Sequence, residues 1–137
     1  MSYLLDTGFL YALLNDKEQA HNAVRQAAAK LDATPFLPTP VTVEVAYLIR
    51  RDLGPEALAQ FIVDLAEPRY ALSAPTATDY ERAAAIVRQY SDAHIDFVDA
   101  ILVAMAERMD IRRVLTLDQR HFRLFRPRHC EAFVLLP

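Results

Sequence analysis

The sequence of 137 residues contains only two glycines, and this scarcity excludes several common enzyme classes. Phosphate-binding loops and dinucleotide-binding turns need several glycines within one short turn, so neither is present. The chain also lacks the HExxH and CxxC patterns that bind zinc or carry redox chemistry. An enzyme with this sequence must therefore take its chemistry from other side chains.

Cysteine and long apolar runs are scarce as well. The single cysteine, Cys130, cannot form a disulfide within the chain, which favours the reducing cytoplasm as the protein's location. No uninterrupted apolar run approaches the roughly 20 residues that a membrane-spanning helix needs. No basic segment followed by an apolar one resembles a secretory signal. We therefore expect a cytoplasmic protein with no membrane partner.

Charge is distributed unevenly along a chain whose net charge is −3. Residues 1–107 hold 8 basic and 15 acidic side chains, a balance of −7. Residues 108–128 hold seven arginines and two acidic side chains, a balance of +5. Such a segment can attract phosphate groups to an otherwise acidic protein, and it can equally be a solvated face of arginines.

Short apolar segments alternate with helical segments along the chain. The predicted strands are Tyr3–Leu5, a segment within residues 34–40, Tyr70–Leu72, Val114–Leu117 and Phe133–Leu136. The predicted helices are Thr7–Leu14, Lys17–Leu31, Pro40–Leu53 with Thr39 as its N-cap, Pro55–Glu67, Thr78–Tyr90 with a capping box of Thr78 and Glu81, and Asp96–Met109. This alternation predicts one α/β domain over residues 1–137, with a mainly parallel sheet between helices on both faces.

Two aspartates stand where predicted strands end. Asp6 follows the first strand and Asp118 follows Val114–Leu117. Open parallel sheets bind ligands at the carboxyl ends of their strands, so both positions are candidates for a site. Each aspartate also precedes a helical segment, where it could serve only as an N-cap.

Two further carboxylates interrupt apolar helix faces. Glu44 shares its face with Val41, Val45 and Leu48, and its alternative role is a buried ion pair. Asp99 is the one residue of 97–106 that is not apolar. It could complement the positive end of the helix dipole, as Asp96 would by capping the helix. We favour the capping role for Asp96 alone.

The four carboxylates Asp6, Glu44, Asp99 and Asp118 form the candidate site. If two strand ends and two helix faces converge, these groups repel one another unless a cation neutralises them. We expect no histidine or cysteine among them, so all ligands would be oxygen atoms. Such a set suits Mg²⁺ or Mn²⁺ better than zinc.

The same residues lie in motifs that resemble those of the PIN-domain nucleases, in particular the small VapC-type toxins of toxin–antitoxin pairs. The matching segments are Leu4–Leu10, the helix with Glu44, Phe97–Ala104 and Val114–Phe122. The resemblance covers essentially the whole chain in length and order of elements. It implies a three-layer α/β/α sandwich with a central, mainly parallel sheet.

The resemblance also implies roles for individual residues. The acidic site maps onto Asp6, Glu44, Asp99 and Asp118, with Asp6 and Asp99 as the principal metal ligands. Asp118 would complete the cluster, and Glu44 would hold a second ion or position the attacking water. The residues expected to support the site from behind the carboxylates are Thr7, Thr116 and Asp96. Gly8 departs from the serine or asparagine common at that position.

The activity implied is endonucleolytic cleavage of RNA phosphodiester bonds with Mg²⁺ or Mn²⁺. The partners implied are an RNA substrate, a cognate VapB-like antitoxin whose tail lies across the active site, and a second copy of the chain in a homodimer. These partners follow from the resemblance and not from the residues themselves.

The segment Arg120–Arg126 alternates cations with aromatic side chains, as some single-strand-binding surfaces do. We expect Arg120, Arg123 and Arg126 to bind the RNA backbone. The alternative is that Phe122 and Phe125 belong to the core, which we favour for Phe122.

Three other functions remain open. Phosphatases with an aspartate nucleophile need a second aspartate two positions after the first, where this chain has Gly8. A PIN-like module could bind RNA or protein without catalysis. A PIN nuclease could act in RNA processing, or on DNA flaps, and not as a toxin.

Overall fold

The computed structural model describes residues 1–137 and contains a five-stranded sheet in which all strand pairs are parallel. The strand order is β3-β2-β1-β4-β5. The strands are β1 (Tyr3–Leu5), β2 (Phe36–Pro38), β3 (Ala71–Ser73), β4 (Arg113–Leu115) and β5 (Val134–Leu136). The predicted strands are confirmed in number and order, while β4 ends at residue 115 and not at the predicted residue 117.

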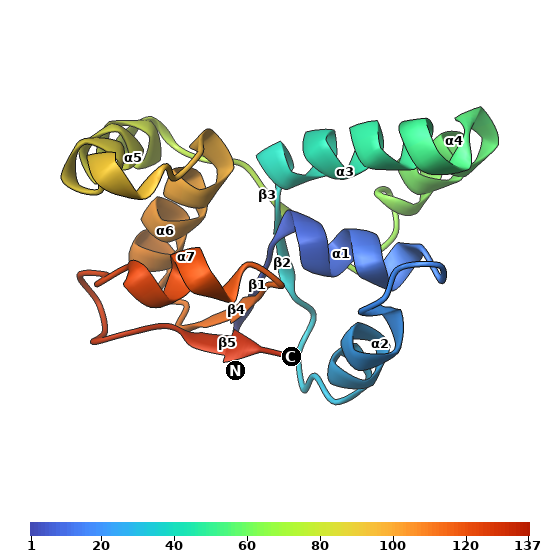
Figure 1. The fold of residues 1–137 in the computed structure, drawn as a ribbon, viewed down its shortest axis with the longest axis horizontal. Helices are drawn as coiled ribbons and strands as arrows, with labels where there is room; N and C mark the ends of the chain where they lie inside the picture. The colour runs from blue at the N-terminus through green and yellow to red at the C-terminus, as the bar shows by residue number, and fades with distance from the viewer.

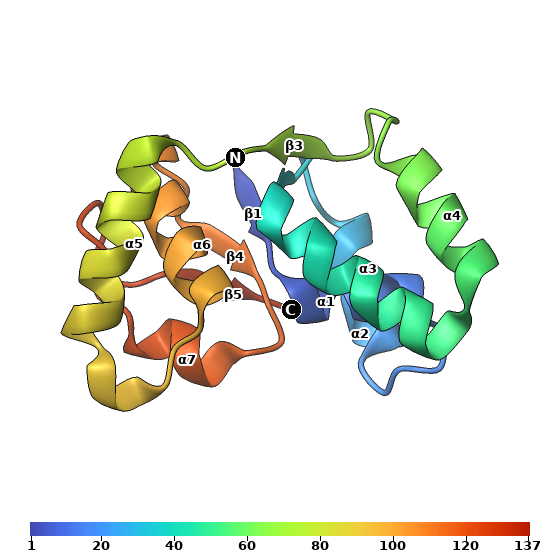
Figure 2. The ribbon, with the colours of Figure 1, turned by 90° about the horizontal axis from the view of Figure 1, so that it is seen from above.

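Helices cover both sides of the sheet, so the predicted α/β/α architecture is confirmed (Figure 1). The helices are α1 (Thr7–Leu14), α2 (His21–Ala29), α3 (Thr39–Leu53), α4 (Pro55–Asp64), α5 (Ala77–Gln89), the 3₁₀ turn η1 (Ser91–Ala93), α6 (Phe97–Met109) and α7 (Gln119–Leu124). Helices α1 to α4 lie on one side, and α5, α6 and α7 on the other, as the two views agree (Figures 1 and 2). None of these helices is both long and apolar enough to cross a membrane.

The core lies where the two helical layers meet the sheet. All three residues of β1 are buried, and so is every residue of α6 from Val98 to Ala106. This burial explains why α6 is apolar on all sides, since each apolar side chain removed from water contributes roughly 1.5–3 kcal/mol. Any carboxylate within α6 must therefore be stabilised by specific partners.

Several helix starts differ from the prediction, and α2 begins at His21 and not at Lys17. Helix α5 begins at Ala77 with a capping box formed by Thr76 and Asp79, so the predicted box of Thr78 and Glu81 is wrong. Asp79 is 2% exposed and accepts two hydrogen bonds of 3.0 Å from Arg108 Nε on α6. This pairing between α5 and α6 favours the capping box that includes Asp79, so α5 begins at Ala77. Helix α3 begins one residue early, with Pro38 and not Thr39 at its N-cap.

The central strands β1 and β4 bring distant parts of the chain to one edge of the sheet. They pair in register, with Leu5 opposite Leu115. The backbone N–H of Asp6 donates to the carbonyl oxygen of Leu115 over 2.9 Å. The chain then leaves both strands for helices, so the side chains after Leu5 and Leu115 share the carboxyl edge of the sheet.

Candidate active site

Asp6 lies at the base of the site, 6% exposed. Its Oδ1 accepts a hydrogen bond of 2.8 Å from the backbone N–H of Thr7, so the capping role considered above is real. Its Oδ2 accepts a second bond of 2.7 Å from the Thr116 hydroxyl. Capping does not need this second contact. It orients the Asp6 carboxylate toward the end of β4.

Asp118 is connected to Asp6 through the same threonine. The Thr116 hydroxyl accepts a hydrogen bond of 3.0 Å from the backbone N–H of Asp118. Asp118 also caps α7, since its Oδ1 accepts from the backbone N–H of His121 over 3.4 Å. Its side chain is 44% exposed, so it stands at the mouth of the site and not at its base.

Asp99 enters the site from the start of α6 and is 7% exposed. It forms a capping box with Asp96: Asp96 Oδ1 accepts from the N–H of Asp99 over 2.8 Å, and Asp99 Oδ2 accepts from the N–H of Asp96. Asp96 itself is exposed and caps the helix, as favoured from the sequence. Asp99 Oδ2 also lies 3.7 Å from Nδ1 of His121, so it faces the residues that follow β4.

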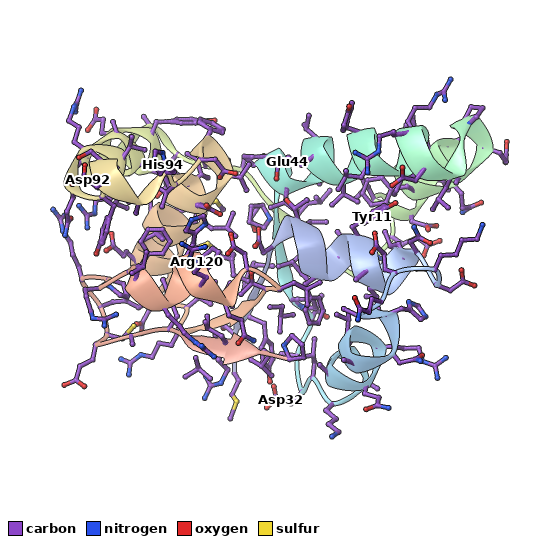
Figure 3. All side chains as sticks on the ribbon, in the orientation of Figure 1. Tyr11, Asp32, Glu44, Asp92, His94 and Arg120 are labelled. Carbon is purple, nitrogen blue, oxygen red and sulfur yellow. The ribbon has the colours of Figure 1, made fainter.

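Glu44 reaches the site from α3 and is half-buried next to the buried Val41 and Val45. The Thr7 hydroxyl donates a hydrogen bond of 2.5 Å to Glu44 Oε1. Glu44 takes part in none of the ion pairs of the chain, so the alternative of a buried ion pair is wrong. In Figure 3 it lies on α3, near the end of that helix from which the chain enters it.

Two pockets, each of about 320 Å³, have Glu44 in their lining. The first is lined by Pro40, Val43, Glu44, Asp96, Phe97 and Val98, and the second by Thr7, Val43, Glu44, Tyr47 and Leu48. The apolar walls and the carboxylate between them place Glu44 where a ligand could enter next to the aspartates.

The aspartates are electrostatically strained against one another. Burial raises the pKa of Asp6 from 3.8 to about 6, and the charges of Asp118 and Glu44 add to this, although hydrogen bonds from Thr116 and Thr7 oppose it. Burial also raises the pKa of Asp99 to about 7, with the charge of Asp96 next in importance. Asp6 and Asp118 contribute to that second shift as well.

This donor set fits a small divalent cation. Ligand atoms from Asp99, Asp118 and His121 all lie within 4.8 Å of one another. Asp6 is close enough to interact with both of these aspartates. The charge of Asp6 raises the pKa of Asp99, and the charge of Asp118 raises the pKa of Asp6. Buried like charges at this spacing favour a bound cation, which would remove the repulsion.

His121 is the member of the site that sequence reasoning missed. Its Nδ1 lies 2.8 Å from Asp118 Oδ2, whereas we expected no histidine among the carboxylates. The spacing in the sequence could have indicated this contact, because His121 is three residues after Asp118. An N-cap residue and the residue three positions later contact each other in the first turn of a helix. The alternation of cations and aromatics in Arg120–Arg126 instead suggested a surface that binds RNA.

The aromatic residues of that segment belong to the core. Phe122 is 1% exposed and Phe125 is fully buried, with their rings edge to face at a centroid distance of 5.5 Å. The core position favoured for Phe122 is therefore confirmed, and the idea that Phe125 belongs to an RNA-binding surface is wrong. The Arg120 side chain is exposed, but Arg126 uses Nη1 to donate to the carbonyl oxygens of Arg123 and Phe125.

Comparison with known proteins agrees with this geometry. Residues 3–126 match the PIN domain family. Ribonuclease VapC26 of Mycobacterium tuberculosis is 34% identical over 138 residues, an alignment that covers 98% of this chain and 99% of that protein. The similarity therefore runs through all segments that carry the carboxylates.

Solved structures share the fold at lower identity. Mycobacterium tuberculosis VapC20, described as a Sarcin-Ricin loop cleaving toxin, superposes with a TM-score of 0.77 at 21% identity, covering 82% of this chain and 86% of that one. VapBC2 from Rickettsia felis, bound to a DNA fragment from its promoter, gives 0.70 at 16% identity over 98% and 97% of the two chains. FitAcB from Neisseria gonorrhoeae gives 0.66 at 19% identity over 85% and 88%. With sequence, fold and strand topology in agreement, this chain belongs to the PIN-domain family.

Proposed function

We propose that this protein is a divalent-metal-dependent endoribonuclease that acts as the toxin of a toxin–antitoxin pair in the cytoplasm. The observation that supports the proposal is the gathering of Asp6, Asp99 and Asp118 at the carboxyl edge of the sheet, where ligand atoms of Asp99 and Asp118 lie within 4.8 Å of each other. The full-length relative at 34% identity is named a ribonuclease, which supports RNA as the substrate.

Asp6 and Asp99 are the principal ligands in this proposal, and Asp118 completes the set at the mouth of the site. When bound there, Mg²⁺ or Mn²⁺ lowers the pKa of a water molecule and stabilises negative charge on the phosphate oxygens. Thr116 keeps two of the ligands in position, because its hydroxyl donates to Asp6 and accepts from the backbone of Asp118. Asp96 acts on Asp99 from outside, through the capping box.

Glu44 has a different task from the aspartates. Its carboxylate accepts a hydrogen bond from the Thr7 hydroxyl, and Glu44 lines both pockets. From there it can orient the attacking water or contact a second ion, and it can accept the proton that the water loses. Because Glu44 has no cationic partner in the protein, its charge remains available for this role.

The arginines of α7 and of the segment after it bring the substrate to the site. RNA is repelled by residues 1–107, whose balance is −7, and attracted by residues 108–128, whose balance is +5. Arg120 and Arg123 are exposed on α7, the helix that Asp118 caps. Figure 3 shows Arg120 on this helix. Both arginines are near Asp118 in the sequence, so they can position the phosphate backbone of RNA over this proposed ligand.

The protein partner is an antitoxin that covers the site, and the toxin itself is a homodimer. One neighbouring structure is a toxin–antitoxin complex from Klebsiella pneumoniae. Large apolar side chains near the pockets are exposed: Val43 by 71%, Tyr47 by 66%, Phe97 by 59% and Tyr80 by 49%. A patch of this kind next to a charged site suits a protein partner.

Cleavage of a mixed tRNA and rRNA pool by the purified protein tests the function. Cuts should be discrete in Mg²⁺ or Mn²⁺, absent in EDTA, and lost in Asp6→Asn and Asp99→Asn. Glu81→Gln is the matched control, since Glu81 is an exposed carboxylate on α5 away from the site. Growth arrest on expression of the wild type, but not of Asp99→Asn, tests the toxin role.

Two results would contradict the proposal. Equal cleavage by Asp99→Asn and the wild type would show that the nuclease activity is a contaminant or lies elsewhere. Folded, antitoxin-free protein that neither cuts RNA nor binds Mn²⁺ would favour a binding module without catalysis.

A further inference from the structure

The imidazole of His121 occupies the position that a metal ligand would take. Its Nδ1 is 2.8 Å from Asp118 Oδ2 and 3.7 Å from Asp99 Oδ2. The side chain is 27% exposed, so one edge of the ring faces the carboxylates while part of the ring reaches solvent. Without a metal, an N–H at Nδ1 can donate a hydrogen bond to Asp118 Oδ2.

The distances correspond to those between neighbouring ligands on one ion. Ligand atoms at about 2.1 Å from a metal are about 3.0 Å apart in an octahedral site and about 3.4 Å apart in a tetrahedral one. The separations of 2.8 and 3.7 Å lie on either side of these values. One cation can therefore contact Nδ1 and both aspartates after side-chain adjustments of a few tenths of an ångström.

We propose that His121 is a direct metal ligand through Nδ1, so that the centre combines one nitrogen with the carboxylate oxygens. The inference rests on the proposed metal-dependent function and adds to it a choice of metal. The ring then carries its proton on Nε2, which leaves the Nδ1 lone pair for the ion. Imidazole binds first-row transition metals well and Mg²⁺ poorly, so the site prefers Mn²⁺ to Mg²⁺.

A role confined to orienting Asp118 does not explain the whole arrangement. A hydrogen bond to Asp118 needs only the contact of 2.8 Å, but the same nitrogen also faces Asp99, which comes from a different helix. The backbone N–H of His121 already donates to the other oxygen of Asp118, so that carboxylate is held without the ring. The ring nitrogen joins α6 and α7 at the point where the cation would lie.

Pulsed electron paramagnetic resonance of bound Mn²⁺ tests the ligation directly. The wild-type protein with Mn²⁺ should show ¹⁴N modulation from a coordinated imidazole, and His121→Gln and His121→Asn should lose it. His94→Asn is the matched control, because His94 is exposed and its left-handed backbone (φ 54°) tolerates asparagine.

Calorimetric affinities for Mn²⁺ and Mg²⁺ supply a second readout. Loss of His121 should weaken Mn²⁺ binding by about 10-fold or more and Mg²⁺ binding by much less, so the ratio of the two affinities falls. If His121 only positions Asp118, the amide of His121→Asn restores Mn²⁺ affinity and the ratio does not change. That result overturns the proposal.

The outcomes separate this inference from the function on which it rests. Mn²⁺ that binds the wild type without ¹⁴N modulation, and is lost in Asp99→Asn, overturns the role of His121 and leaves the metal-dependent nuclease in place. No Mn²⁺ binding by the wild type overturns both.

Discussion

Replacing Asp6 by asparagine should make the metal-free protein more stable at neutral and alkaline pH, although it removes a proposed metal ligand. Asparagine keeps an oxygen that can accept from the backbone N–H of Thr7, and its amide can donate to the Thr116 hydroxyl. It lacks the buried negative charge. The substitution therefore isolates the energetic cost of ionising this position.

The magnitude follows from the pKa of Asp6, which burial raises from 3.8 to about 6. A carboxyl group whose folded-state pKa is raised binds its proton more tightly in the folded state, so stability is lost as the pH rises from about 4 to about 6. At about 1.4 kcal/mol per pKa unit, the ionised group costs about 3 kcal/mol at pH 8 and about 1 kcal/mol at pH 4.5. The Thr116 hydroxyl loses its acceptor in the variant, which offsets about 1 kcal/mol.

Urea unfolding in EDTA at pH 4.5 and pH 8 provides the assay. The variant should gain about 2 kcal/mol at pH 8, which for a chain of this length is about 7 °C in Tm, and should gain little at pH 4.5. Added Mn²⁺ should stabilise the wild type and not the variant. A variant that is less stable than the wild type by the same amount at both pH values would refute the reasoning.

Further substitutions test other parts of the structure. Thr116→Val should lower metal affinity by about 10–100-fold in calorimetry, because it releases Asp6, whereas Thr116→Ser should not. Phe125→Ala should lower the free energy of unfolding by about 3–5 kcal/mol in urea, and a variant of native stability would contradict its place in the core. Arg120→Gln should reduce the slope of log affinity for RNA against log salt by about 1. Arg126→Gln should change that slope less, because its guanidinium is bound to backbone carbonyls, and equal slopes for the two variants would contradict this.

The order of strands and acids along the chain was enough to predict the architecture. Apolar segments of three or four residues followed by helices give a parallel sheet, and the carboxyl ends of its strands must then share one edge. That argument alone predicts that Asp6 and Asp118 lie together. The apolar faces around Glu44 and Asp99 pointed to the same place, since isolated carboxylates on such faces need a partner. Their role as metal ligands stays a prediction.

The sequence did not predict the start of α5 correctly, because two capping boxes are possible in the same segment. Thr78 and Glu81 have the spacing of a capping box as Thr76 and Asp79 do, and local preference does not choose between them. The ion pair between Asp79 and Arg108 on α6 decides the choice, and it depends on how α5 packs against α6. Propensities within one segment contain no information about that packing.

The segment after β4 also shows that local sequence patterns contain no information about packing, here for residues near the candidate site. Alternating arginines and phenylalanines are compatible with a surface or with a short helix that buries one face. The burial of Phe122 and Phe125 against the core decides for the helix, and the turn that buries them directs His121 toward the carboxylates. One packing event therefore removes Phe125 as a stacking residue, keeps Phe122 in the core as favoured from the sequence, and adds His121 to the candidate site.

By itself, the sequence predicted which carboxylates gather at the carboxyl edge of the sheet, because strand and helix periodicity are local properties. Only the tertiary structure decided which of them touch. Thr116 and Asp6 are 110 residues apart, and their hydrogen bond exists because β1 and β4 pair in one register. A shift of that register by one residue would turn the two side chains to opposite faces and separate them.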